Sequence, residues 1–109
     1  PKDFVPAVGQ GAVAVECRTD DHATRAALAT VTDPDTYDAV SVERAWLREL
    51  GSGCSSPVGA HVIGATLWAF LAGDAGVQRR QLDLVGDASA DHAAAAGLAR
   101  AMRDAAMVR

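Results

Sequence analysis

Cysteine, basic residues and long apolar runs are all scarce in this chain. Only Cys17 and Cys54 occur among the 109 residues. They are too few for a disulfide framework and lack metal-ligand spacing, which favours a reducing, cytoplasmic setting. No apolar run reaches the roughly 18–20 residues that a membrane helix needs. The sequence opens Pro-Lys-Asp without an initiator methionine or a signal-peptide pattern, as though it were cut from something longer.

The shortage of positive charge argues against polyanionic partners. Ten Lys and Arg residues oppose fourteen Asp and Glu residues, giving a net charge of -4, and the only adjacent basic pair is Arg79–Arg80. We therefore expect neither nucleic-acid nor anionic-membrane binding. His22, His61 and His92 are far apart and lack carboxylate or cysteine companions at ligand spacing, so no metal site is expected.

The first part of the chain predicts one strand and one short helix. Residues 12–15 are small and apolar without polar alternation, a pattern typical of a strand that is buried on both faces. Such a strand needs neighbours on either side, and this chain has few candidates for them. A short helix over residues 21–31 follows, with Asp20 or Asp21 as its N-cap.

A longer helix is predicted from Pro34 to Leu50, with Asp33 as its N-cap. Its apolar residues share one arc of roughly 160° at helical periodicity: Ala39, Val40, Val42, Trp46, Leu47 and Leu50. Glu43 falls near the middle of that arc. An unpaired buried carboxylate is costly, so Glu43 either finds an Arg or backbone N–H donors, or reaches water at the rim.

The second half of the chain predicts strands and a final helix. Three strands are expected at residues 58–63, 66–71 and 78–85, joined by hairpins at Gly64 and residues 73–76. A last helix, capped by Asp91, presents an apolar face: Ala94, Leu98, Met102 and Ala105. The predicted fold class is α+β, a small three-stranded antiparallel sheet packed with helices.

Both faces of the second predicted strand are apolar. Leu67, Ala69 and Leu71 share one face, whereas Trp68 and Phe70 share the other. The aromatic pair is either partly covered by a loop or part of a docking surface for another domain.

Cys54 is the residue that the sequence favours most for chemistry. It lies in a Gly/Ser-rich loop, where exposure and function are common, whereas Cys17 ends an apolar segment and is expected to fill a core. Cys54 follows a helix C-terminus, the negative end of the helix dipole, which should raise the pKa of its thiol. A protease or redox role is therefore disfavoured, and a reactive partner would be a strong electrophile. Gly9-Gln10-Gly11 is more simply a turn than a phosphate cradle.

Several motifs together resemble the C-terminal part of the hydroxymethylbilane synthase (porphobilinogen deaminase) family. They keep the order and spacing of that family over nearly the whole chain. The matching blocks are Phe4–Ala12, Glu16–Arg18, Val42–Ala45, and Gly53–Cys54 followed by Pro57–Ala60.

The resemblance implies an enzyme that joins four porphobilinogen molecules, releasing ammonia, to give hydroxymethylbilane for haem and related pigments. The growing tetrapyrrole chain is built on a dipyrromethane cofactor, which a thioether would hold at Cys54. Gln10 and Gly11 match a loop that borders the active-site cleft. The catalytic aspartate of the family and its substrate-binding arginines match nothing here, so the 109 residues alone are predicted to be inactive.

The resemblance also divides the chain. Residues 1–31 match a strand and helix that complete an upstream α/β catalytic domain, and residues 32–109 match the cofactor-carrying α+β domain. The partners are then the missing N-terminal domains of the same protein, which is expected to be a monomer. Glu43 belongs to a recurring block and is expected to be paired, bracing the loop with Cys54. Ser55-Ser56 departs from the usual Gln-Val and puts the geometry of that loop in doubt.

An alternative of a different class remains open. The chain could be a stand-alone α+β binding domain whose Cys54 is an idle surface thiol. The aromatic pair Trp68 and Phe70 would then mark the partner surface.

Overall fold

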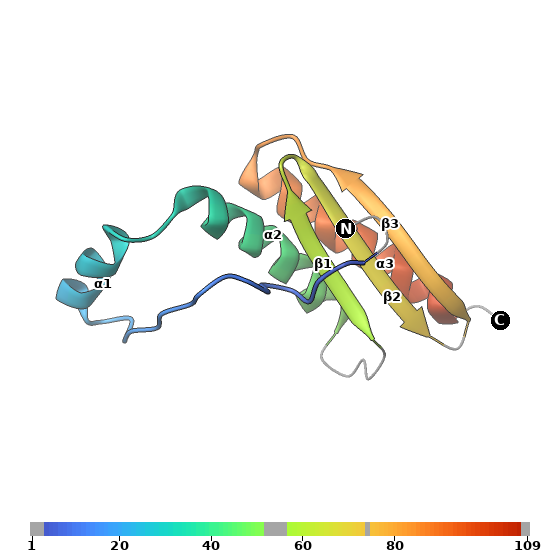
Figure 1. Cartoon of the computed structure of the whole chain (residues 1–109), viewed down its shortest axis with the longest axis horizontal. Helices are drawn as coiled ribbons and strands as arrows, with labels where there is room; N and C mark the ends of the chain where they lie inside the picture. Colours follow the sequence, from blue (N-terminus) through green and yellow to red (C-terminus); the bar gives the residue numbers. More distant parts are fainter. Residues whose placement is uncertain (1–3, 52–56, 74, 108–109) are drawn as a thin grey trace.

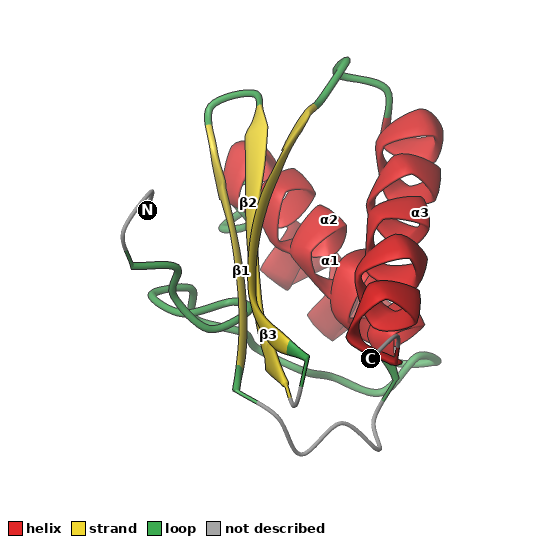
Figure 2. Ribbon diagram, turned by 90° about the vertical axis from the view of Figure 1, so that its right-hand side faces the viewer, coloured by secondary structure: helices red, strands yellow, loops and turns green. Residues whose placement is uncertain are grey.

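Three helices and one antiparallel sheet make up the computed structural model, which describes residues 4–51, 57–73 and 75–107. The strand order is β1-β2-β3, and helices α2 and α3 cover one face of the sheet (Figures 1 and 2). This arrangement confirms the predicted α+β class. The elements are α1 His22–Ala29, α2 Pro34–Leu50, β1 Val58–Ile63, β2 Thr66–Gly73, β3 Gly76–Asp83 and α3 Ala88–Met107.

The core lies between the sheet and the two longer helices. In α2 the side chains of Val42, Trp46 and Leu50 are buried as predicted, whereas Leu47 lies at the margin and is 36% exposed. Inward-facing residues of β1 and β2 and a row of small residues on α3 complete this core. Its buried apolar members are Val42, Trp46, Leu50, Ala60, Leu67, Ala69, Leu71, Ala95, Ala99 and Met102.

The third strand is displaced from its predicted position. We predicted residues 78–85, but β3 spans Gly76–Asp83. The reason is the tight hairpin, in which Gly73 pairs directly with Gly76, so that pairing with β2 begins at once. Gly76 has a φ of 120°, which a residue with a side chain rarely adopts.

The start of the last helix also differs from the prediction. Helix α3 begins at Ala88, and its first turn is capped by Asp87, whose Oδ2 accepts the N–H of Ala90 at 2.9 Å. Asp91 is therefore not the cap. Its buried carboxylate accepts the N–H groups of Val85 at 2.8 Å and Gly86 at 3.0 Å, and so fixes the loop between β3 and α3.

The buried face of α3 is one position away from the predicted face over its first turns. Ala94 near the start of the helix and Ala105 near its end are exposed. Asp91, on the first turn, instead faces the β3–α3 loop through its hydrogen bonds. The residues of α3 that enter the core are Ala95, Ala99 and Met102.

The predicted strand over residues 12–15 is not formed in the part of the chain that the structure describes. Residues 12–18 are without regular structure, and Val13 and Val15 are 93% and 67% exposed. A strand needs neighbouring backbone for its hydrogen bonds, and no described segment pairs with this one. Cys17 is exposed, so its predicted role as core filler is wrong. The assignment of residues 1–31 to a neighbouring domain stays a prediction.

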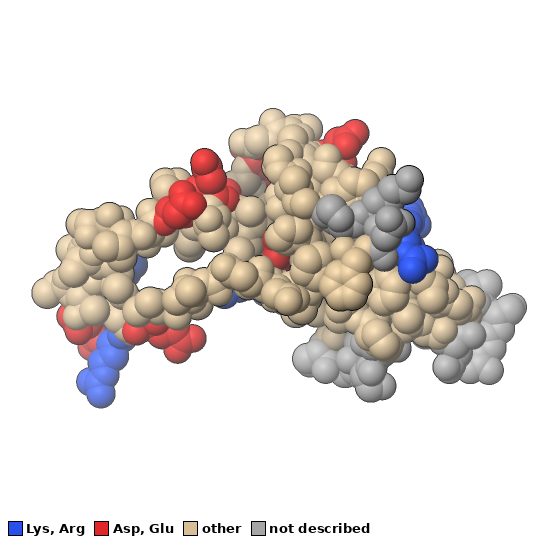
Figure 3. Space-filling model, in the orientation of Figure 1, with Lys and Arg blue, Asp and Glu red and all other residues tan. Residues whose placement is uncertain are grey.

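Helix α1 stands apart from the core. It buries no residue, and the space-filling view shows open space between the extended segment before it and helix α2 (Figure 3). Asp21, one of the two predicted caps, accepts both the hydroxyl (2.7 Å) and the backbone N–H (3.1 Å) of Thr24. These two hydrogen bonds, the hydroxyl foremost, lower the pKa of the Asp21 carboxyl.

The N-terminal segment lies on the face of the sheet opposite the helices (Figure 2). Pro6 accepts the N–H of Ala60 through its carbonyl oxygen at 2.9 Å. Trp68 and Phe70 are half-buried on this face, and the Arg79 guanidinium lies 5.5 Å from the centre of the Phe70 ring. Of the two interpretations of the aromatic pair, partial cover by a loop agrees with this arrangement.

The backbone of that segment passes close to Gly59 of the sheet. A Cβ atom built on Gly59 would lie 2.6 Å from the carbonyl oxygen of Val5 and 2.8 Å from that of Pro6. We expect Gly59→Ala to lower the free energy of unfolding by about 1–3 kcal/mol, because the backbone of the segment must move. Urea denaturation monitored by circular dichroism measures the change.

Gly97→Ala is the control for that substitution. A Cβ on Gly97 would meet only the end of the flexible Arg100 side chain, at 3.8 Å. Alanine in this helical position should stabilise the protein by up to about 1 kcal/mol. Equal effects of the two substitutions would contradict the close contact at Gly59.

Candidate functional site

A single buried carboxylate joins three segments of the chain. Glu43 of α2 is 2% exposed. Its Oε1 accepts the N–H of Gly9 at 2.8 Å, and its Oε2 accepts the N–H of Val62 in β1 at 2.9 Å. Both oxygens thus receive backbone donors, as a buried carboxylate requires. Of the two interpretations of Glu43, burial with backbone N–H partners is therefore confirmed.

The position of β1 at the edge of the sheet explains why backbone N–H groups of this strand bind partners outside the sheet. Strand β1 is at the end of the sheet and pairs only with β2 among the described strands. The N–H groups of Ala60 and Val62 instead meet the Pro6 carbonyl and the Glu43 carboxylate. The N-terminal segment and α2 therefore share the edge of β1, and Glu43 satisfies a donor that would otherwise be unpaired.

The turn held by Glu43 contains the two predicted cleft residues. The N–H of Gln10 donates to the carbonyl of Ala7 at 3.1 Å, and the N–H of Ala7 donates to Gln10 Oε1 at 3.1 Å. Gly9 and Gly11 have φ angles of 71° and 85°, a conformation that favours glycine. Gln10 and Gly11 are exposed. Their role at a cleft stays a prediction.

His61 lies beside the same carboxylate. Its Nδ1 is 3.5 Å from Glu43 Oε2. That nitrogen is inaccessible to solvent and has no hydrogen-bond partner in the part of the chain that the structure describes. Sequence reasoning set His61 aside because it lacks metal-ligand companions. The contact could not be anticipated from spacing, since it depends on how α2 meets the edge of β1.

Cys54, the predicted cofactor site, lies outside the described residues. The residues on either side of its segment are held by the core. Gly51 donates its N–H to the carbonyl of Leu47 at 3.2 Å, and the carbonyl of Pro57 accepts the N–H of Ala72 at 3.0 Å. Glu43 was expected to brace this segment. Its described contacts are with the turn at Gly9 and with β1.

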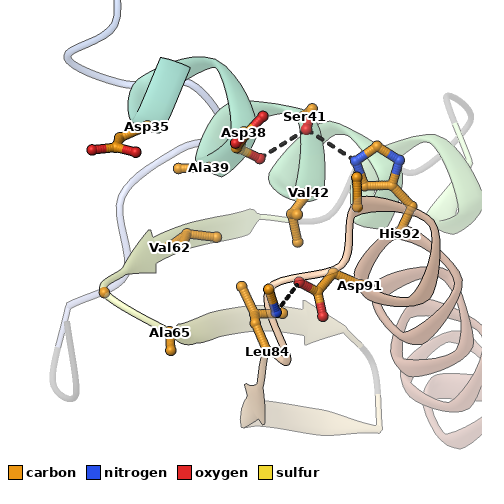
Figure 4. Close-up of a pocket in the computed structure, with 13 residues that line it drawn as sticks. Asp35, Asp38, Ala39, Ser41, Val42, Val62, Ala65, Leu84, Asp91 and His92 are labelled. Atoms are coloured by element: carbon orange, nitrogen blue, oxygen red, sulfur yellow. Dashed lines mark hydrogen bonds between the residues drawn. The ribbon is translucent and has the colours of Figure 1, made fainter. Parts of the chain in front are cut away.

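A separate cavity of about 480 Å³ lies between the first half of α2, the β1–β2 turn and the β3–α3 loop (Figure 4). The Ser41 hydroxyl donates to the Asp38 carbonyl oxygen at 2.8 Å, and His92 Nε2 lies 2.9 Å from Ser41 Oγ. His92 is half-buried. No sequence pattern links Ser41 and His92, because they are brought together only by the packing of α2 on α3. Gln10 and Gly11, the predicted site residues that the structure describes, do not line this cavity.

The surface of the described residues adds two observations. Basic side chains appear only in separate small groups on the face shown in Figure 3. Within residues 4–51, 57–73 and 75–107, no helix has the length and apolar character of a membrane span.

Comparison with known proteins identifies the family. A family model described as "Porphobilinogen deaminase, C-terminal domain" matches residues 37–95. A porphobilinogen deaminase of Syntrophobacter fumaroxidans is 51% identical over 69 residues, covering 62% of this chain and 22% of the relative. One of Mycobacterium leprae is 55% identical over 60 residues, covering 55% of this chain and 19% of the relative.

A third relative comes from an archaeon. A probable porphobilinogen deaminase of Methanopyrus kandleri is 48% identical over 62 residues, covering 57% of this chain and 21% of the relative. The chain thus spans about a fifth of the length of these relatives. The family model covers more than half of the chain, from α2 with its buried Glu43 to the first turns of α3, and the chain therefore belongs to the porphobilinogen deaminase family, in the region of its C-terminal domain.

Proposed function

We propose that this chain is the cofactor-carrying part of a porphobilinogen deaminase, which condenses four porphobilinogen molecules into hydroxymethylbilane and releases ammonia. The observation that carries the proposal is the family match over residues 37–95. This range contains α2 from its first turn onward, β1, and the segment between them with Cys54.

In this proposal Cys54 forms a thioether with a dipyrromethane cofactor. The C–S bond would form when the thiol sulfur adds to the methylene carbon of a porphobilinogen that has lost ammonia, with the thiol proton passing to the pyrrole nitrogen. Such an electrophile does not require a thiol of strongly lowered pKa. A second porphobilinogen would supply the second ring with loss of a second ammonia. When bound, the group supplies the pyrrole end on which the tetrapyrrole chain is built.

The described residues suit a tether at this position. Leu50, at the end of α2, is buried, and Pro57 is held to β2 by the hydrogen bond from Ala72. Both ends of the segment that contains Cys54 are thus attached to the core. A cofactor bound covalently to a segment with both ends attached keeps the growing chain at high effective concentration for each coupling.

The charge of the chain indicates what the rest of the protein must supply. Porphobilinogen carries two carboxylates, and a chain of net charge -4 with scattered basic residues offers no cationic cleft for them. The cationic groups and the catalytic acid would come from N-terminal domains of the same protein. In this proposal Gln10 and Gly11 border the resulting cleft, and the complete protein acts as a cytoplasmic monomer.

The test uses a chimera in which these 109 residues replace the matching C-terminal region of the Mycobacterium leprae relative. We expect the chimera to form hydroxymethylbilane from porphobilinogen, and Cys54→Ser to abolish this activity. Cys17→Ser is the matched control, because Cys17 is exposed on a segment without regular structure, and it should leave turnover unchanged.

Two results would refute this proposal. Turnover by the folded Cys54→Ser chimera would exclude the tether. Turnover by the 109 residues alone would show that no further domain is needed. An inactive chimera that folds, beside an active parent enzyme, would instead favour the stand-alone binding domain with an idle Cys54.

A further inference from the structure

We propose that Glu43 is a positioning residue that holds Gln10 and Gly11 of the N-terminal turn in place. Through them it affects the binding of substrate and not the attachment of the cofactor. This inference rests on the proposed function, in which that turn borders the cleft. It rests equally on the contacts of Glu43, which reach the turn and β1.

The turn is attached to the folded core by the packing of Val8 and by two hydrogen bonds among the described residues. Before the turn, the carbonyl of Pro6 is bound to the N–H of Ala60 in β1. Within the turn, the N–H of Gly9 is bound to Glu43 Oε1. Its remaining hydrogen bonds are internal, from Gln10 to Ala7 and from Ala7 to the Gln10 side chain.

Beyond the turn, the chain gains no support from the core. Ala12 donates its N–H back to the carbonyl of Gly9 at 3.0 Å, and the following residues 13–18 are exposed. Within the turn, the bond between Gly9 and Glu43 is the described hydrogen bond that ties the backbone next to Gln10 and Gly11 to the core.

The second carboxylate oxygen of Glu43 binds the turn indirectly to the edge of the sheet. Glu43 Oε2 is bound to the N–H of Val62, which the ladder with β2 holds in register opposite Leu67. Movement of the turn is thus tied to the rigid edge of the sheet. A glutamine at this position keeps the size of the side chain but has one acceptor oxygen, so one of the two backbone donors must be lost.

The experiment compares Glu43→Gln with Glu49→Gln in the chimera described above. Glu49 lies on the same helix, and its carboxylate pairs with Arg100 at the surface. We expect Glu43→Gln to raise the KM for porphobilinogen by about tenfold or more, as loss of a charge-assisted hydrogen bond allows. The fraction of protein carrying the dipyrrole adduct, measured by intact mass, should stay unchanged. Glu49→Gln should change neither quantity.

A double-mutant cycle separates positioning from general destabilisation. If Glu43 acts by positioning Gln10, the loss of Gln10 removes part of the effect of Glu43 on substrate binding. The fold increase in KM of Glu43→Gln/Gln10→Ala should then be smaller than the product of the increases in the two single variants. Glu43→Asp keeps both acceptor oxygens and should recover part of the lost affinity. If Glu43→Gln fails to fold, the KM of Glu43→Asp tests the positioning role in its place.

The outcomes distinguish the two proposals. Loss of the adduct in folded Glu43→Gln, an unchanged KM, or KM increases that multiply in the cycle would each overturn the positioning role while leaving the proposed function intact. A wild-type chimera that folds but has neither adduct nor turnover would refute the proposed function and this inference with it.

Discussion

Replacing Glu43 by alanine lowers the free energy of unfolding by about 2–4 kcal/mol, because two backbone donors lose their only acceptor. The N–H groups of Gly9 and Val62 are both part-buried where they meet the carboxylate, at 2.8 and 2.9 Å. Water can reach neither as freely as it would in the unfolded chain. Urea denaturation of the 109-residue chain, followed by circular dichroism, measures this change.

Glu49→Ala is the matched control for that prediction. It removes a carboxylate from the same helix, but its partner Arg100 is half-exposed and the ion pair lies at the surface. Its loss should cost less than about 1 kcal/mol. Amide exchange gives a second check, since Gly9 and Val62 should exchange faster only in Glu43→Ala. A stability equal to that of the wild type would show that the carboxylate supports neither segment.

Replacing Trp46 by alanine lowers the free energy of unfolding by about 3 kcal/mol, at the low end of the range for large aromatic side chains in a core. Trp46 is 0% exposed and is among the largest fully buried side chains. Its removal leaves a cavity between α2, the sheet and α3. The loss stays at the low end because the indole Nε1 is buried without a hydrogen-bond partner among the described residues, so that its removal also relieves a buried donor that lacks an acceptor there.

Trp68→Ala provides the comparison, since the second tryptophan is half-buried on the outer face of the sheet. It should cost less than half as much as Trp46→Ala. Denaturation must be followed by circular dichroism, because each substitution removes a tryptophan fluorophore. Similar losses at the two positions would contradict a core confined to the helix-covered face.

Helical periodicity placed Glu43 on the apolar arc of α2 but left open whether it would be buried with partners or reach water. The apolar arc of α2 placed Glu43 beside Val42 and Trp46, and that arrangement holds. Its donors lie 34 residues before it and 19 residues after it in the chain. No local pattern identifies such donors, because they are set by the approach of two segments to the free edge of β1.

The errors in predicted elements arise in the same way. Asp87 and Asp91 are both capping residues by type, and only the loop fixed by Asp91 decides that α3 begins at Ala88. For residues 12–15, apolar character predicted a strand, but a strand also needs a pairing partner, which periodicity cannot supply. The hairpins were predicted well because glycine-containing turns are coded locally.

The candidate site likewise has residues that the sequence could select and contacts that it could not. The Gly/Ser-rich loop singled out Cys54, but its expected role and that of Gln10 came only from the resemblance to a family, since neither has chemical companions nearby in sequence. His61 was missed, because its contact with Glu43 joins two elements. The structure adds the link that the sequence could not show, a carboxylate connecting the predicted cleft turn to the domain with the predicted cofactor site.

The mass of the intact chimera tests the central claim most directly. After incubation with porphobilinogen, the wild-type chimera and Cys17→Ser should each carry one covalent adduct of dipyrrole mass, and Cys54→Ser should carry none. An unmodified wild-type protein, or an adduct that persists in Cys54→Ser, would contradict the account.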